Sequence, residues 1–234
     1  MLSVVLGIVV VAMLRNHPRD VFGGEAEGER IPESKPRRPL LAVINLRVVT
    51  LGVAYFCIKF VRYTFIFWFG IYLVEGYGLS GTDAGYFQVP FPLAGILGSV
   101  AGGLISDRVF GARRAPVATL MLIGLTLSLL AMLIIPGNVW VVALMYAACG
   151  FFLFGPDMLV SGTSAMDFGE EDAGTVTGIV NGMGSVGGAI QGLVVGLVSQ
   201  HYGWPAVFAV LVGMGVVASA VTATLWNVRG RAVS

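Results

Sequence analysis

The stretch LGVAYFCIKFVRYTFIFWFGIYLV, residues 51–74, decides the class of fold. A helix needs roughly 20 mainly apolar residues to cross a hydrocarbon core of about 30 Å, and this stretch is long enough to do so. Its only charged side chains are Lys59 and Arg62. The stretch therefore predicts a transmembrane helix with two cations in a place where lipid offers neither water nor a counter-ion.

The rest of the chain has the same character. Of its 234 residues 56% are hydrophobic and 12% are charged, which is too apolar for a soluble globular domain. Apolar segments long enough to span a membrane cover residues 46–74, 84–105, 115–135, 139–166, 173–199 and 205–226. We expect an all-α polytopic membrane protein with six transmembrane helices, in residues 46–228, followed by a short tail at 229–234.

The N-terminal part is different. Residues 1–14 are apolar but shorter than a normal span, and they lack the basic start and the small-residue cleavage site of a signal peptide. We interpret them as the clipped end of a helix. Residues 15–45 contain Pro, Gly and mixed charges, which is typical of a flexible linker.

The positions of Lys and Arg predict the orientation. They cluster in the linker, in the 106–114 loop and after the last span, whereas the loops at 75–83, 136–138 and 200–204 contain none. By the positive-inside rule the linker and the C-terminus are expected to be cytoplasmic. The expected location is the plasma (inner) membrane of a bacterium.

Topology does not explain Lys59 and Arg62. They are three residues apart, which places them on one face of the helix, and they lie too far from its ends for their charges to reach the interface. One hypothesis is an anion site in a water-filled cavity. The alternative is an internal salt bridge to Asp157, an acid in the middle of the fourth apolar segment, although one acid cannot neutralise two cations.

The fourth apolar segment contains Gly155 and Pro156. A proline inside a helix removes a hydrogen bond and frees a backbone carbonyl, so we expect a kink here, either static or a moving hinge. Asp157 follows directly. It either faces the same cavity as the two cations or pairs with Lys59.

Small residues recur every four positions in two spans, which lets helix backbones approach closely in lipid. These rows are Gly174, Gly178 and Gly182; Gly184, Gly188, Gly192 and Gly196; Gly98 and Gly102; and Gly95, Ser99 and Gly103. In the loop after the second span, topology explains the arginines. Asp107, at the end of that span, is a candidate latch between two helices.

Several motifs together resemble the major facilitator superfamily. GGLISDRVFGARR, residues 102–114, is similar to the loop motif between helices 8 and 9, although one extra residue precedes its second Gly. The matching positions are Gly103, Asp107, Arg108, Gly111, Arg113 and Arg114. KFVRYTFIFW, FFLFGPDML and AGTVTGIVNGMGSVGGA resemble helices 7, 10 and 11 of the organophosphate:phosphate antiporters.

This resemblance implies that residues 46–228 form the C-terminal bundle, helices 7 to 12, of a carrier whose N-terminal half is in the same longer chain or a separate one. Residues 1–14 would then be the remnant of helix 6, and 15–45 the central linker. It also implies exchange of an organic phosphate, such as glycerol-3-phosphate or a hexose phosphate, for inorganic phosphate by alternating access. A non-transporting sugar-phosphate sensor and a half-transporter without independent activity are the alternatives.

The resemblance also implies roles for individual residues. In the family an Arg of helix 7 binds substrate phosphate with an Arg of helix 1, and Arg62 matches the helix 7 position. Lys59 resembles the Lys of the exchanger branch, whereas Phe154 and Ser185 stand where the family has Tyr. The expected substrate-binding residues are Lys59, Arg62 and Asp157.

No residue pattern indicates an enzyme. His17 falls in the linker and His201 on the outer face, and neither is expected near Asp157. The chain has no P-loop, and its two cysteines form no metal-binding motif. We expect no cofactor, no metal and no nucleic-acid partner.

Overall fold

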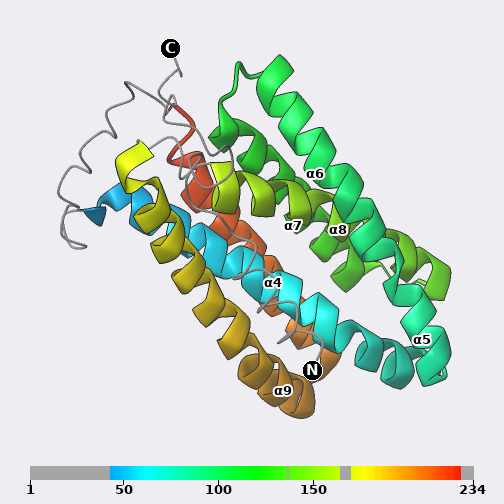
Figure 1. The fold of residues 1–234 in the computed structure, drawn as a ribbon. Coiled ribbons are helices and arrows are strands. Elements are labelled where there is room, and N and C mark those ends of the chain that lie inside the picture. The colour runs from blue at the N-terminus through cyan, green and yellow to red at the C-terminus, as the bar shows by residue number, and fades with distance from the viewer. Residues whose placement is uncertain (1–42, 136, 164–169, 228–234) are drawn as a thin grey trace, which may run out of the picture. The chain divides into compact units, whose positions relative to one another are not determined.

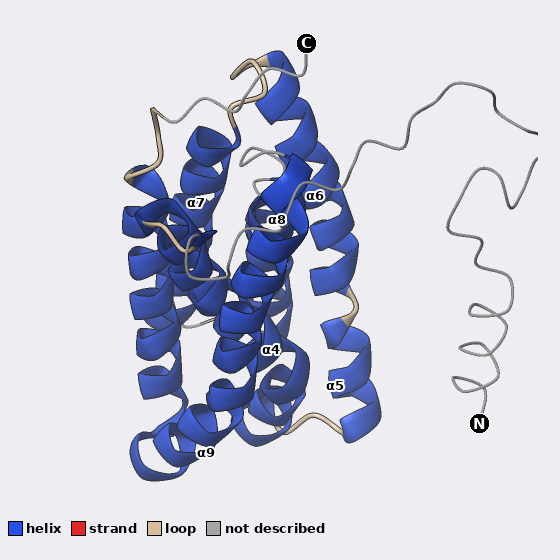
Figure 2. Cartoon of the chain, turned by 60° about the vertical axis from the view of Figure 1, so that its left-hand side comes forward, coloured by secondary structure: helices blue, strands red, loops and turns tan. Residues whose placement is uncertain are grey.

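The computed structural model describes residues 43–135, 137–163 and 170–227, which all belong to one of the chain's two units, Arg38–Ser234. The helix predicted at 1–14, nearly all of the 15–45 linker and the tail at 229–234 lie outside the described residues. Within the described ranges every regular element is a helix (Figure 2).

The stretch with the two cations lies in helix α4 (Leu46–Tyr77), which is 32 residues long. Asn45 caps its start, because its side chain accepts a hydrogen bond from the backbone N–H of Val48 at 3.0 Å. Gly78 ends it with a left-handed backbone, φ 67°. In Figure 1, α4 runs in cyan between gold α9 and the green helices α6 to α8.

The remaining helices follow the predicted segments closely. They are α5 (Gly81–Gln88), α6 (Pro90–Arg108), α7 (Arg114–Ile134), α8 (Val139–Met158), the π-helix η1 (Leu159–Thr163) and α9 (Glu170–Ala223). Five helical stretches are long and apolar enough to cross a membrane: Leu46–Tyr77, Gly81–Arg108, Arg114–Ile134, Val139–Gly162 and Ala173–Ala223. The chain is therefore an all-helical integral membrane protein with several spans.

Helix α9 contains two helical limbs that meet at a single residue, whereas the sequence predicted two spans joined by a loop at 200–204. It is 54 residues long, and its backbone leaves the helical region at Gly203, with φ 76° and ψ 177°. A straight helix of this length would measure about 80 Å, more than twice the hydrocarbon core of about 30 Å. Instead, its ribbon turns back on itself, from gold to orange, in Figure 1. Glycine tolerates this positive φ, so one residue replaces the predicted loop.

Helices α6 and α8 meet backbone to backbone. A Cβ atom at Gly98 would lie 1.9 Å from the carbonyl oxygen of Phe151, and one at Gly150 would lie 2.2 Å from that of Phe91. Such contacts leave no room for any side chain, which confirms the close approach predicted from the row in α6.

The glycine rows of α9 behave in two ways. Gly184 and Gly188 lie against the side chains of Tyr55 and Tyr63 of α4. Gly187, which the four-residue rows omit, lies against the α4 backbone: a Cβ atom there would be 2.4 Å from the carbonyl oxygen of Phe56. At four others a Cβ atom would have no neighbouring atom within 4 Å, namely Gly174, Gly178, Gly182 and Gly192. For these four the expected close packing is wrong within the described part of the chain.

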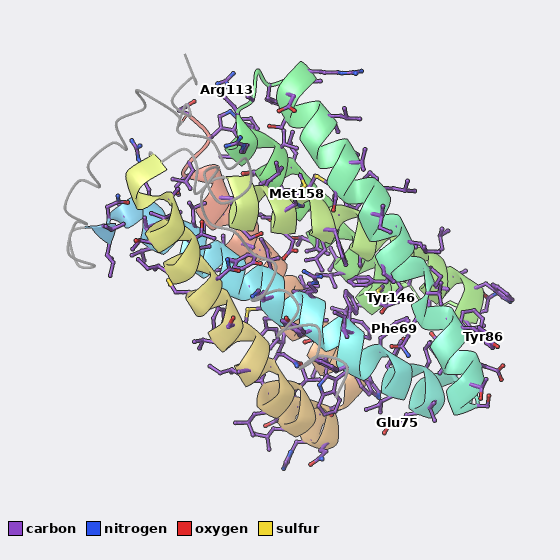
Figure 3. The ribbon with its side chains drawn as sticks, in the orientation of Figure 1. Phe69, Glu75, Tyr86, Arg113, Tyr146 and Met158 are labelled. Atoms are coloured by element: carbon purple, nitrogen blue, oxygen red, sulfur yellow. The ribbon has the colours of Figure 1, made fainter. Side chains whose placement is uncertain are left out.

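An aromatic cluster fills the space between α4, α6 and α8. The rings of Phe69 and Tyr146 stack with centroids 3.6 Å apart, and the rings of Phe65 and Phe91 pack on Tyr146. The Tyr146 hydroxyl donates a hydrogen bond to the carbonyl of Phe65 at 3.3 Å. Phe69 and Tyr146 face each other in Figure 3. This cluster fixes α4 relative to α8, the two helices that carry the charged residues.

Candidate functional site

Lys59 and Arg62 lie near the middle of α4, and both side chains are half-buried. The backbone places them on one face, as the spacing predicts. Each has different surroundings, and the two cations are therefore not equivalent.

Arg62 forms an ion pair with Asp157 of α8. Its Nη1 lies 2.6 Å from Asp157 Oδ2, and the two side chains are 30% and 12% exposed. Its guanidinium also lies over the ring of Phe154, 4.6 Å from the centroid. The internal salt bridge considered from the sequence is thus present, but Asp157 pairs with Arg62 and not with Lys59.

The ion pair does not satisfy all the polar atoms of its two side chains. Arg62 Nε and Asp157 Oδ1 are buried and have no hydrogen-bond partner within the described residues. An arginine and a carboxylate often pair through two parallel hydrogen bonds, whereas these two share one. Arg62 therefore retains an unused buried donor, which is a costly arrangement unless a ligand or water satisfies it.

Lys59 has no carboxylate within ion-pair distance in the described part of the chain. Its Nζ donates a long hydrogen bond of 3.4 Å to Ser185 Oγ of α9 and lies 4.9 Å from the centre of the Tyr55 ring. In the described part of the chain it forms no ion pair. The site consequently carries two positive charges and one negative charge, and Lys59 supplies the excess.

The backbone of α8 is irregular where it presents Asp157. Pro156 lies inside the helix, and the π-helix η1 begins two residues after Asp157. The Ser161 hydroxyl donates a hydrogen bond to the backbone carbonyl of Asp157 at 2.6 Å, as serine side chains in helices commonly do. Gly155 lies against Gly98 and Met121, so this segment is packed on α6 and α7. Movement about Gly155 and Pro156 stays a prediction.

The loop motif lies away from these charges. Helix α6 ends at Arg108 and α7 begins at Arg114, with positive φ at Gly111 and Ala112. Arg113 Nε donates to the carbonyl of Phe110 at 3.3 Å. In Figure 3, Arg113 lies at one end of the bundle, and Glu75 and Tyr86 lie at the other.

Two motif residues at the end of α6 are exposed. Asp107 makes no hydrogen bond or ion pair with any described residue, and Arg108 is exposed beside it. Gly103, by contrast, is partly buried, with the Met158 side chain 3.6 Å from a built Cβ. The latch proposed for Asp107 stays a prediction.

Sequence reasoning missed two residues that shape the site. Tyr55 lies four residues before Lys59, one helical turn away, and that spacing was the signal that could have identified it. Gly95 of α6 supports Phe154: a Cβ there would lie 2.6 Å from the Phe154 ring. The row of small residues includes Gly95 but does not show that it lies against Phe154, because that contact is with another helix.

Comparisons with known proteins agree with this architecture. The family model described as Major Facilitator Superfamily matches residues 1–191 and 113–232. Sugar phosphate exchanger 3 of Gallus gallus is 35% identical over 169 residues, which are 69% of this chain and 33% of the relative. The glycerol-3-phosphate transporter of Bacillus subtilis (strain 168) is 34% identical over 178 residues, 75% of this chain and 40% of the relative.

A plant relative aligns over more of the chain. Putative glycerol-3-phosphate transporter 5 of Arabidopsis thaliana is 30% identical over an alignment of 254 residues that covers 90% of this chain and 50% of the relative. The chain thus spans between a third and a half of the length of these relatives.

Proposed function

Because this chain belongs to the Major Facilitator Superfamily, a family of transporters and not of enzymes, we propose that it is the C-terminal half of a phosphate-ester carrier. The two limbs of α9 on either side of Gly203 then count as two spans. Together with the four other long helices they make six, corresponding to helices 7 to 12 of a twelve-helix carrier.

The proposed activity is exchange of an organic phosphate for inorganic phosphate. The relatives include a sugar phosphate exchanger and glycerol-3-phosphate transporters, which supports a phosphate ester as the substrate class. In the proposed mechanism the two six-helix halves rock about a site near the membrane midplane and expose it to each side in turn. The proposed partners are therefore the N-terminal half, the two phosphates and membrane lipid.

The observation that carries this proposal is the excess positive charge near the middle of α4. Among the described residues Lys59 forms no ion pair, and Arg62 keeps a buried Nε donor without a partner. A phosphate group provides several strong acceptors and negative charge, which these donors lack. Guanidinium geometry suits two phosphate oxygens at once, and the ammonium of Lys59 adds a point charge beside it. The N-terminal half would supply the opposite wall.

The test is phosphate binding to the purified chain in lipid nanodiscs, with exchange of radiolabelled phosphate measured in the intact carrier. Arg62→Ala is expected to lower phosphate affinity at least tenfold and to abolish exchange, because a charged hydrogen bond contributes roughly 1.5–3 kcal/mol. Arg47→Ala is the matched control, since Arg47 is an exposed residue in the first turn of the same helix. Unchanged binding in a folded Arg62→Ala protein would contradict the proposal.

Two other functions make different predictions in the same assays. A sugar-phosphate sensor would bind the ester without any flux in the intact protein. A half-transporter without independent activity would show no phosphate binding at all. Binding together with exchange supports the carrier.

A further inference from the structure

Asp157 binds one of the donors of Arg62 that a phosphate could use. Its Oδ2 lies 2.6 Å from Arg62 Nη1, and the Phe154 ring covers one face of the same guanidinium. The Nε donor, which lies on the other side of the guanidinium from Nη1, is buried without a partner among the described residues. A phosphate that takes two parallel hydrogen bonds from Arg62 must therefore share the guanidinium with Asp157 or displace it.

The charged groups that face Asp157 all come from α4. They are Arg62 and Lys59, with the phenol of Tyr55 beside them. The other elements packed here contribute uncharged groups: Gly98 of α6 and Met121 of α7 lie against Gly155, and Ser161 of η1 binds the backbone of Asp157. Within the described residues no second acid and no further base stabilises the carboxylate once Arg62 turns to a ligand.

A phosphate dianion brings two negative charges to a site that already holds one. Two anions on the same half-buried cation repel each other, because the surroundings screen charge less than water does. Protonation of Asp157 removes this repulsion and also converts the carboxylate into a donor for a phosphate oxygen. The proton comes from solvent: the carboxylate gains one proton, and no bond of the phosphate forms or breaks.

The ion pair is also built weakly enough to open. Asp157 holds Arg62 through one hydrogen bond, and its Oδ1 has no partner among the described residues. Separating Asp157 from Arg62 therefore breaks one hydrogen bond between the two side chains, whereas a pair with two parallel hydrogen bonds would lose two.

We propose that Asp157 is a built-in competitor for Arg62, which an incoming phosphate displaces while Asp157 takes up one proton from solvent. This inference rests on the proposed function and adds proton uptake to it. It assigns Asp157 a role opposite to that of a simple substrate-binding group, since the ionised carboxylate weakens phosphate binding.

The experiment is calorimetric titration of the full chain in nanodiscs with inorganic phosphate at about pH 8, where phosphate in solution is mostly the dianion. The titration is repeated in two buffers with different ionisation enthalpies, and the difference gives the number of protons taken up. We expect about one proton per phosphate bound for the unchanged chain, by linkage between binding and protonation. Sulfate, which accepts no proton at this pH, should give the same count.

Asp157→Asn locates the proton. In this variant proton uptake should vanish, and phosphate affinity should rise several-fold because the competitor has lost its charge. Asp83→Asn, the same change at an exposed acid of α5, should leave both values unchanged. A structural role for the ion pair would lower thermal stability in Asp157→Asn without changing the proton count.

Each result has one meaning. Phosphate binding without proton uptake in the unchanged chain overturns this inference and leaves the proposed function standing. Uptake that persists in Asp157→Asn also overturns it, because the proton then travels on the ligand. Absence of phosphate binding to the unchanged chain overturns the proposed function and this inference with it. If Asp157→Asn fails to fold, the proton counts of the unchanged chain with phosphate and with sulfate still decide.

Discussion

Arg62 is held from one side by two residues of α8. Phe154 lies against the face of its guanidinium and Asp157 binds its edge, and these two residues are three positions apart on the same helix. Phe154 in turn rests on Gly95 of α6, where a side chain would collide with the ring. The orientation of the phosphate-binding cation therefore depends on three helices, although only α4 carries it.

Phe154→Leu is expected to weaken phosphate binding without loss of the fold. The change removes the contact between cation and ring, which is worth roughly 0.5–2 kcal/mol, or about two- to thirtyfold in affinity. The matched control is Phe152→Leu, because Phe152 lies on the same helix but faces Gly124 of α7. Equal affinities of the two variants for inorganic phosphate, measured by calorimetry, would show that the ring does not position Arg62.

At the scale of whole helices, the contact between α6 and α8 positions the site. Gly98 and Gly150 let the two backbones touch, and Ser99 donates a hydrogen bond to the carbonyl of Phe154 at 3.3 Å. Pro156, where the sequence predicts a kink, comes directly after this contact. A change in the separation of these helices would move Phe154 and Asp157 together.

Gly98→Ala tests this contact. The new methyl group would meet the Phe151 carbonyl, a backbone atom that cannot rotate away, so we expect destabilisation of about 1–3 kcal/mol. Gly192→Ala is the control, since no atom lies within 4 Å of its built Cβ and alanine favours a helix by up to about 1 kcal/mol. In detergent, the midpoint temperature of thermal unfolding should be lower for Gly98→Ala than for the unchanged chain. For Gly192→Ala it should be equal to or higher than that of the unchanged chain. The reverse order would be incompatible with this contact.

At the scale of the whole molecule, the two ends of the bundle differ in charge. Three arginines lie where α6 and α7 are joined, namely Arg108, Arg113 and Arg114. Glu75, near the end of α4, lies at the opposite end of the bundle and accepts a hydrogen bond from Trp204 Nε1 at 2.9 Å. The proposed orientation puts the arginine-bearing end in the cytoplasm.

Cysteine labelling checks that orientation. Val109 and Tyr202 are 70% and 77% exposed, whereas the natural Cys57 and Cys149 are buried and should give little background. In intact cells a membrane-impermeant maleimide should label Tyr202→Cys and not Val109→Cys. After permeabilisation it should label both. The opposite pattern would invert the proposed topology, and labelling of both in intact cells would argue against a sealed bundle.

Several features were determined by the sequence alone. The membrane class, the approximate bounds of the helices and the common face of Lys59 and Arg62 follow from length, hydropathy and spacing, which are local properties of a chain in lipid. The sequence also predicts a kink at Pro156, because a proline cannot donate the helical hydrogen bond wherever it occurs in a fold, and this kink stays a prediction.

The tertiary structure decided which groups meet. From the sequence, Asp157 either faced a cavity with both cations or paired with Lys59, but the packing of α4 on α8 pairs it with Arg62, and Lys59 bonds to Ser185. Likewise, Gly184 lies against Tyr55 of α4, whereas Gly174 has no atom of another helix close to it, although both belong to similar rows. Partner choice depends on the relative rotation and height of helices that are distant in sequence. Those quantities are set by the packing of all side chains between the helices, and no local pattern contains them.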